Sequence, residues 1–287
     1  MLRKRLKNLM IMEITIKISK QDFDLAVPAA KESKGTIFAK LESKINQAIE
    51  DIADDRLGDV GIASVNSHSD GPLAKAVMDL ASVDVFLREM RDLDLVLTET
   101  GFGIVSTNNT APASKIRVDA LDGELRVKWL QLSDDILEMC FKLQGWYQQG
   151  LVIIDTLFCF FGFLTKYAGF QAPISKDWEN ATATILDTDR WLRDKISDEF
   201  MDELILQMAT NSLSDKNKGV VHQIRRIIGV AILGNKGTAY EYFRRLMNTL
   251  EGDLESFSTY AGSQAYEANH FKPYENKAED GAFHFVG

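Results

Sequence analysis

Side chains that could ligate a metal or transfer protons are scattered along the chain. The four histidines stand at His68, His222, His270 and His284. None lies three or four positions from another histidine or a cysteine, the spacing that brings two ligands onto one helical face. We therefore expect no metal site and no cofactor.

Carboxylates are the second type of side chain that could do chemistry. Two groups of aspartates lie on expected helices: Asp51, Asp54 and Asp55 on one, and Asp187, Asp189 and Asp194 on another. Such groups could bind a divalent cation or serve in acid-base catalysis. Solvated helix faces give the same pattern far more often, and we interpret both groups in that way.

Nucleophiles are also poorly placed for catalysis. Cys140 and Cys159 both lie in apolar surroundings, where a free cysteine behaves as a small buried hydrophobe. Two cysteines make no disulfide framework, so we expect a reducing compartment. No G-x-S-x-G motif is present, and the sequence therefore gives no support for an enzyme.

Residues 93–107, LDLVLTETGFGIVST, combine glycines with hydroxyl side chains as a phosphate-binding loop does. No lysine follows them, and neither a Walker motif nor a complete G-x-G-x-x-G is present. Two apolar runs around a short glycine-containing turn instead predict a β-hairpin.

Composition and charge restrict the class of protein. The chain has 287 residues, 45% of them hydrophobic and 26% charged, which is typical of a globular protein. Its net charge of -9 disfavours a protein that coats nucleic acid, because that role needs clustered Lys and Arg. An acidic surface is compatible with a protein that surrounds DNA without gripping it.

The most hydrophobic stretch is LVIIDTLFCFFGFL, residues 151–164. It is shorter than the ~20 apolar residues that span a bilayer. Asp155 would also have to enter the membrane at a cost of several kcal/mol. We therefore predict that this stretch belongs to the protein core and that the chain has no membrane partner.

Apolar spacing predicts a mainly α fold. Residues 13–19 alternate apolar and polar side chains, which indicates an edge strand or arm. Helices are expected over residues 37–52, 73–90, 115–129, 136–143, 178–196, 200–208 and 220–233, with Ser133, Asp134 and Asp135 capping the fourth. Residues 239–268 are expected to form one long helix or two helices in line. Residues 60–72 and 211–219 are expected to form loops, and residues 270–287 an extended tail.

Two stretches share the order helix, loop, helix: one begins near residue 37 and the other near residue 178. This order suggests two similar halves, although helical pairs are common enough to arise without duplication. The predicted fold is therefore one or more helical bundles with a small β-hairpin and extended terminal arms. We place an N-terminal domain at residues 1–110 and a C-terminal domain at residues 111–287.

Residues 93–121, LDLVLTETGFGIVSTNNTAPASKIRVDAL, resemble a characteristic stretch of an uncharacterised family from bacterial and prophage genomes. The helical pairs also resemble, in topology only, phage head-to-tail connector proteins. The second resemblance implies a ring-forming neck adaptor that contacts portal and tail or neck proteins and lets DNA pass as cargo. It further implies arms at residues 1–19 and 270–287 that reach neighbouring subunits, in a virion assembled in the bacterial cytoplasm.

The first hypothesis is therefore a structural virion protein that forms a homo-oligomeric ring. Aromatic residues outside the core periodicity are candidates for its interfaces: Phe102, Phe271, Phe283 and Phe285. These side chains could equally pack within their own chain. The rival hypotheses are a cytosolic helical module that binds or regulates another protein, and an enzyme whose site is built from dispersed residues.

Overall fold

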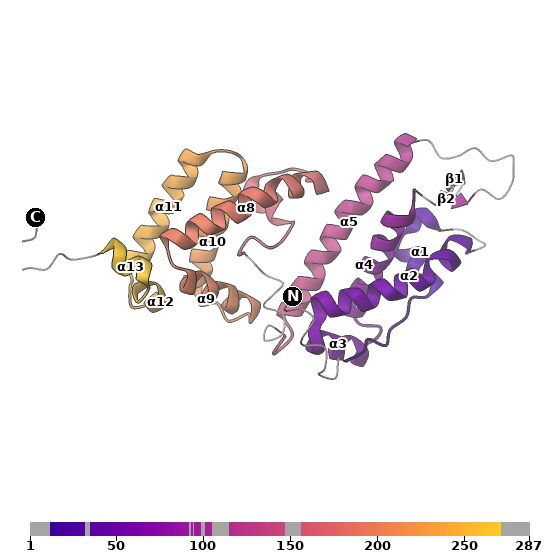
Figure 1. Cartoon of the computed structure of the whole chain (residues 1–287), viewed down its shortest axis with the longest axis horizontal. Helices are drawn as coiled ribbons and strands as arrows, with labels where there is room; N and C mark the ends of the chain where they lie inside the picture. Colours follow the sequence, from indigo (N-terminus) through magenta and orange to yellow (C-terminus); the bar gives the residue numbers. More distant parts are fainter. Residues whose placement is uncertain are drawn as a thin grey trace, which may run out of the picture.

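The computed structural model describes residues 12–31, 35–91, 93, 95–98, 101–104, 115–146 and 156–270. These residues are mainly α-helical, as predicted. Figure 1 shows two lobes, with α1 (Lys20–Ala26), α2 (Thr36–Ile52), α3 (Gly58–Ser67) and α4 (Pro72–Glu89) in the first. The second contains α7 (Phe163–Ala168), α8 (Ser175–Lys195), α9 (Asp198–Ala209), α10 (Asp215–Ile232), α11 (Lys236–Glu251), α12 (Ser258–Ala261) and α13 (Gln264–Asn269).

Helix α4 is the centre of the first lobe. It contacts α1, α2 and α3, and on another side it packs against α5 (Lys115–Phe141). Apolar side chains therefore cover most of its circumference, and Val77, Ala81 and Val83 are completely buried. A helix that is apolar nearly all round is expected in the interior of a bundle.

Residues 12–19 are extended, and their apolar positions are buried as the alternation predicts. The predicted strand is wrong in one respect, because no backbone partner pairs with this segment among the described residues. Asparagine side chains take the place of a neighbouring strand. Asn66 Oδ1 accepts from the Thr15 N–H at 2.9 Å, and Asn46 Oδ1 accepts from the Ile18 N–H at 3.0 Å. Residues 12–19 of the predicted N-terminal arm thus pack on their own lobe.

The predicted loop over residues 60–72 is wrong for most of its length. A π-helical turn, η3 (Ala53–Leu57), joins α2 to α3, and α3 continues to Ser67. The apolar residues Ile62 and Val65 are buried, which gives this glycine-rich stretch an inward helical face. Gly61 allows the first turn of α3 to lie close to η3, since a Cβ at this position would be 2.8 Å from the Leu57 Cβ.

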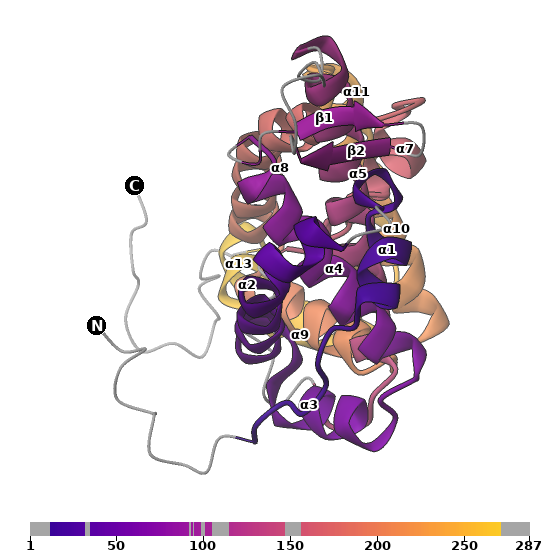
Figure 2. The ribbon, with the colours of Figure 1, turned by 90° about the vertical axis from the view of Figure 1, so that its right-hand side faces the viewer.

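Strand β1 (Leu95–Thr98) pairs antiparallel with β2 (Gly101–Ile104), with Leu95 opposite Ile104. The turn at residues 99–100 lies outside the described residues, so the hairpin as a whole stays a prediction. Strand β2 contacts η2 (Pro28–Ala30) and α2. Figure 2 shows the two strands side by side near one end of the molecule.

Helix α5 runs without interruption for 27 residues, so the predicted break at residues 133–135 is wrong. The capping residues serve other purposes. The Ser133 hydroxyl donates to the Trp129 carbonyl at 2.9 Å, inside the helix. Asp134 instead accepts hydrogen bonds from the Phe161 and Gly162 N–H groups, both at 2.9 Å. Asp134 therefore joins α5 to the segment that precedes α7.

In the second lobe, α10 packs against α7, α8 and α11. The joint between the helices near residues 178–196 and 200–208 is confirmed: Ser197 separates them and accepts from the Phe200 N–H at 3.1 Å. Ser214 caps α10 in the same way, so α10 begins within the predicted loop over residues 211–219.

The prediction of one long helix, or of two helices in line, over residues 239–268 is wrong. Helix α11 ends at Glu251, and α12 turns back to contact α9. Phe257 and Tyr260 are buried with their ring centroids 5.9 and 6.2 Å from that of Phe200. Burial of these two rings against α9 requires the chain to turn, which a straight helix would not allow.

The two helices predicted for each half pack together: α2 on α4, and α8 on α10. This arrangement agrees with the order that suggested a duplication, although the duplication itself stays a prediction. The boundary after residue 110 lies outside the described residues and also stays a prediction. Helix α5 packs along α4 and meets α8 of the second lobe.

The predicted burial of residues 151–164 is confirmed where the structure describes them, because Leu157, Phe158, Phe161 and Leu164 are all buried. None of the described helices has the length and apolar character needed to cross a membrane.

Candidate functional site

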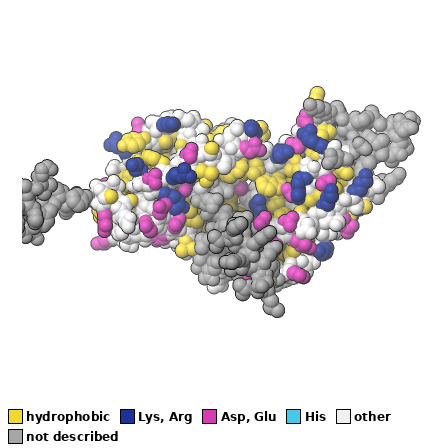
Figure 3. All heavy atoms as spheres, viewed as in Figure 1, with side chains coloured by type: hydrophobic (Ala, Val, Ile, Leu, Met, Phe, Trp, Pro, Cys, Tyr) yellow, Lys and Arg dark blue, Asp and Glu magenta, His cyan; other side chains and the backbone are white. Residues whose placement is uncertain are grey.

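A groove of about 590 Å³ lies where α4, α5 and α8 meet. We call it the inter-lobe groove. Its apolar lining comes from all three helices: Leu87 from α4, Trp129 and Leu130 from α5, and Trp178 from α8. Figure 3 shows hydrophobic side chains gathered in the middle of this face, between the two lobes.

Helical spacing brings these side chains to one surface. On α5, Asp122, Arg126 and Trp129 follow one another at intervals of four and three residues, which places them along one helical face. Leu87 on α4 and Arg91, two residues beyond the end of that helix, also line the groove. Helix α8, which contacts α5, adds Ser175, Trp178 and Glu179 from its first turns.

Ion pairs surround the apolar part of the groove. Arg126 Nε lies 2.6 Å from Asp122 Oδ2, and this hydrogen bond raises the pKa of the arginine. Arg91 Nη2 lies 3.1 Å from Asp119 Oδ1, and Arg88 pairs with Asp84. Because each of these arginines has a carboxylate partner, the rim is not a strongly cationic anion-binding site.

Each groove tryptophan also contacts a neighbour. The guanidinium of Arg56 lies 5.2 Å from the centroid of the Trp129 ring, and burial lowers the pKa of Arg56. The ring centroid of Trp178 lies 6.1 Å from that of Phe161. Both indoles remain half-buried. Half-buried tryptophans beside paired arginines are the residues enriched in the centres of protein interfaces.

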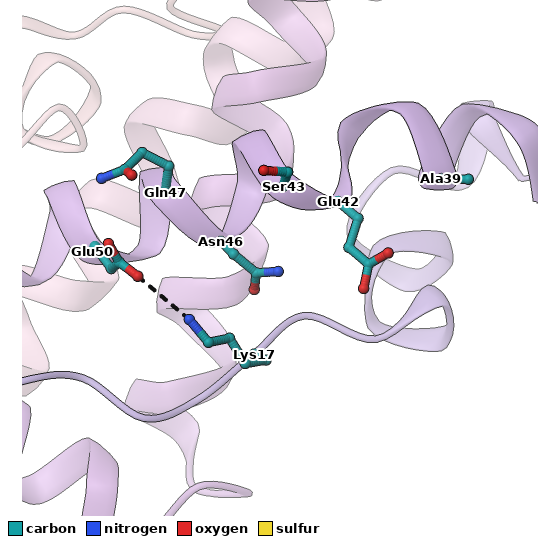
Figure 4. A pocket seen from close by; sticks show the side chains of 7 residues that line it. All are labelled: Lys17, Ala39, Glu42, Ser43, Asn46, Gln47 and Glu50. Carbon is teal, nitrogen blue, oxygen red and sulfur yellow. Dashed lines mark hydrogen bonds and ion pairs between the residues drawn. The ribbon is translucent and has the colours of Figure 1, made fainter.

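A second groove of about 470 Å³ lies between the extended residues 12–19 and α2. Figure 4 shows Lys17 reaching across it to Glu50, and the Nζ to Oε1 distance is 3.4 Å. The other polar side chains come from a single face of α2, where Asn46 is occupied with the Ile18 N–H. The Lys17–Glu50 pair is exposed and fixes the segment only weakly.

The histidines are not brought together in the described part of the chain. His68 is exposed just after α3, and His222 is exposed on α10. The His270 ring stacks on that of Tyr266, with their centroids 4.1 Å apart. His284 lies outside the described residues. Within the residues that the structure describes, no group of three or more His, Cys, Asp or Glu side chains could hold a metal ion.

The interpretation of the aspartates as solvated is wrong for Asp189, which is only 5% exposed. Burial raises the pKa of this carboxyl, and Arg193 opposes the shift with its Nε 2.9 Å from Asp189 Oδ2. Arg193 also lies 2.7 Å from Asp202 Oδ1 and 3.4 Å from Asp198 Oδ1 on α9. The cluster therefore ties α8 to α9. The other aspartates of the two groups are exposed: Asp51, Asp54, Asp55, Asp187 and Asp194.

Asp134 has a shifted pKa that the sequence did not indicate. Burial raises its pKa to about 6, although the N–H groups of Phe161 and Gly162 favour the charged form. Its sequence signal, a Ser-Asp-Asp run, was interpreted as a local helix cap. The partners are 27 and 28 residues away, and no local pattern identifies them.

Burial disfavours the thiolate form of both cysteines. Cys140 is buried as predicted, and Cys159 is half-buried. Burial raises the pKa of both thiols to about 12, so that both remain protonated.

The interface residues predicted from the sequence are not tested. Phe102 belongs to β2, where its Cα faces Leu97, but its side chain is not described. Phe271, Phe283 and Phe285 lie outside the described residues. The groove residues Trp129 and Trp178 are not among the candidates named from the sequence. The sequence signal that could have identified the groove is the spacing of Asp122, Arg126 and Trp129 on α5.

A family model matches part of the chain. No curated protein and no solved structure shows significant similarity to it. The matched segment runs from the end of α3 to just beyond α5, and it includes residues 93–121. It therefore contains the two helices that form the α4 and α5 walls of the inter-lobe groove. Over residues 65–143, the chain is similar to a family of unknown function, DUF6712.

Proposed function

We propose that this chain is a structural, non-enzymatic protein of a phage or prophage particle. In this proposal it is a head-to-tail connector or neck adaptor that assembles with copies of itself into a ring. It contacts portal and tail or neck proteins, and DNA passes it only as cargo. The protein belongs to the virion and is present in the host cytoplasm during assembly.

The observation that carries the proposal is the open inter-lobe groove. Trp129, Trp178 and Leu130 provide an apolar centre, and paired arginines form a polar rim. An apolar aromatic centre with a polar rim is the usual arrangement of a protein interface. Such a surface supports a role in binding protein more than a role in chemistry.

Two features of the sequence support the viral part of the proposal. Residues 93–121 resemble a family from bacterial and prophage genomes, and the overall charge of -9 suits a channel through which DNA slides. The family match over residues 65–143 adds no function to this argument.

Electron microscopy of the purified full chain tests the proposal. The expected result is ring-shaped particles of uniform diameter, whose number increases with protein concentration. Particles no larger than the single two-lobed chain at every concentration would contradict it.

The groove's volume favours a second candidate, a cytosolic helical module that binds or regulates another protein. A volume of about 590 Å³ falls within the range of about 300–1,000 Å³ that is typical of ligand pockets. This candidate predicts a monomer that forms a small complex of fixed stoichiometry. The same micrographs distinguish the two, since only the connector forms rings by itself.

A further inference from the structure

We propose that a row of unpaired cations on the second lobe binds the phosphate backbone of double-stranded DNA. We call it the cationic row, and it consists of Lys166 on α7, Arg226 on α10 and Arg245 on α11. The inference goes beyond the proposed function, in which DNA only passes the protein, because it identifies a surface that contacts the DNA. It does not require that the chain form rings.

The first part of the row crosses from α7 to α10, which pack against each other. Lys166 Nζ lies 5.4 Å from the centroid of the Tyr167 ring. The same centroid lies 5.4 Å from that of His222 on α10. Arg226 follows His222 by four residues, so the two side chains share one face of α10.

The second part of the row crosses from α10 to α11, which also pack together. The guanidinium of Arg226 lies 4.5 Å from the centroid of the Tyr242 ring. The guanidinium of Arg245 lies 5.8 Å from the same centroid. Side chains from three helices therefore form one continuous set of contacts that begins at Lys166 and ends at Arg245.

The three cations of the row are exposed and have no acidic partner. Among the residues that the structure describes, no carboxylate oxygen lies within 4.0 Å of their charged nitrogens. This includes Glu241, which is one turn before Arg245 on α11. The row differs in this respect from the inter-lobe groove, where Arg88, Arg91 and Arg126 all have carboxylate partners.

The local charge of this surface is opposite to that of the whole chain. Helices α10 and α11 together carry seven Lys and Arg against three Asp and Glu, whereas the net charge of the chain is -9. The overall charge disfavours a protein that coats nucleic acid along its whole surface. It does not exclude binding at one basic surface, because exposed charges further apart than about 10 Å are largely screened.

The pKa of His222 supports the proximity of these charges. Partial burial lowers this pKa, and the charges of Arg226, Lys166 and Arg225 lower it further. A neutral imidazole still has one N–H group that can donate to a phosphate oxygen. His222 therefore adds a donor between two cations of the row.

The aromatic rings of this surface hold cations and are not free as apolar anchors. Arg226 covers Tyr242, and its Nη2 also donates to the Tyr242 hydroxyl at 2.9 Å. A protein interface has an apolar aromatic centre, whereas phosphate contacts need only positioned charges and donors. Single strands stack their bases on uncovered rings. Rings covered by cations therefore favour a duplex that is bound through its backbone.

The extent of the row favours a polymer over a single phosphate group. Four side chains lie between Lys166 and Arg245 in the set of contacts, so one phosphate cannot reach both ends. Each strand of a duplex carries one negative charge per ~3.4 Å of helix axis. A duplex can therefore contact all three cations at once.

Fluorescence anisotropy of a labelled DNA duplex of mixed sequence, titrated with the full chain, tests the proposal. Each phosphate that a cation contacts releases counterions, so the affinity depends on salt. For three contacts, the association constant should fall about 40-fold between about 50 and 200 mM salt. Absence of binding at the lower salt concentration would overturn the inference.

Two double variants with the same loss of charge locate the contact. Lys166→Gln with Arg245→Gln should weaken binding about tenfold at low salt and reduce the salt effect from about 40-fold to about 3.5-fold, the value for one contact. Lys40→Gln with Arg117→Gln removes two exposed cations from α2 and α5 and should change neither value. Far-UV circular dichroism should show that both double variants fold like the natural chain.

The remaining outcomes decide against the inference or separate it from the proposed function. Equal losses in the two double variants would show a general effect of net charge and overturn the assignment. The Lys and Arg residues among positions 1–10 are present in both, so they do not affect this comparison. Tighter binding of labelled polyglutamate than of the duplex would mean that the row serves an acidic protein. DNA binding by a chain that stays monomeric would support the inference and contradict the ring, and rings that bind no DNA would do the reverse.

Discussion

Gly229 on α10 lies directly against the backbone of α7, and its replacement by alanine should weaken the second lobe. A Cβ at this position would lie 2.3 Å from the carbonyl oxygen of Tyr167 and 2.5 Å from its carbonyl carbon. The oxygen would have to retreat by about 1 Å to reach ordinary C···O contact. Because the obstacle is backbone, no side-chain rotation can relieve the contact.

The expected magnitude follows from two opposing effects. Overpacking of a core costs about 1–3 kcal/mol, and replacing a helical glycine by alanine returns about 1 kcal/mol. We expect Gly229→Ala to lose about 2 kcal/mol of unfolding free energy, from the upper part of the overpacking range. Gly219→Ala on the same helix should gain about 1 kcal/mol, because its Cβ would have no neighbour within 4 Å.

Urea denaturation followed by far-UV circular dichroism measures both variants against the natural chain. If the dependence of unfolding free energy on urea concentration is the same in both variants, their urea midpoints report stability. The unfolding free energies of the two variants should then differ by about 3 kcal/mol. If Gly229→Ala were as stable as Gly219→Ala, the close approach of α7 and α10 would be refuted.

Three further changes have expected outcomes. Arg193→Met should cost about 3 kcal/mol in urea denaturation, because it leaves the buried Asp189 carboxylate without its cation. Arg225→Met should cost about 2 kcal/mol in the same assay, because the Arg225 Nε donates to the Leu157 carbonyl at 2.9 Å. Asp134 has a raised pKa of about 6, so the folded state binds the extra proton and stability falls as pH rises from about 4 through 6. Asp134→Asn should remove this part of the pH dependence.

Each of these changes has a control or a contrary result. Arg190→Met, at an exposed arginine one turn from Arg193, should cost less than about 0.5 kcal/mol. Arg226→Met removes an exposed contact with Tyr242 and should cost less than Arg225→Met. If the natural chain gained stability relative to Asp134→Asn as the pH rose, hydrogen bonding rather than burial would control the Asp134 pKa.

Helices with a regular apolar face were predictable from the sequence. The apolar residues of α2 and α4 repeat at helical spacing, and the structure buries the face that they form, with Ile45 on α2 and Leu80 on α4 among its members. Local periodicity suffices in these helices because the same face meets the core along their whole length.

Elements that depend on distant partners were not predictable. Residues 12–19 alternate like a strand, but the hydrogen bonds come from Asn46 and Asn66 on two helices. The turn after α11 exists because Phe257 and Tyr260 pack against Phe200, which lies 57 and 60 residues earlier. Periodicity alone extends one helix through such a turn, because it carries no information on the distant residue, Phe200, against which the two rings pack.

The candidate site was predictable only in its chemistry. The spacing of Asp122, Arg126 and Trp129 could be read from the sequence, and it places the three residues on one face of α5. That α4 and α8 meet this face with Leu87 and Trp178 depends on packing between the lobes. The groove therefore became recognisable only once the helices were placed.

Sedimentation velocity of the purified full chain, over a range from micromolar to millimolar concentration, tests most directly whether this protein acts by associating with itself. The account predicts species that are several times heavier than the 32.2 kDa chain and that become more abundant with concentration. Arg126→Glu should shift this association to higher concentration. A single 32.2 kDa species throughout the range would contradict the account.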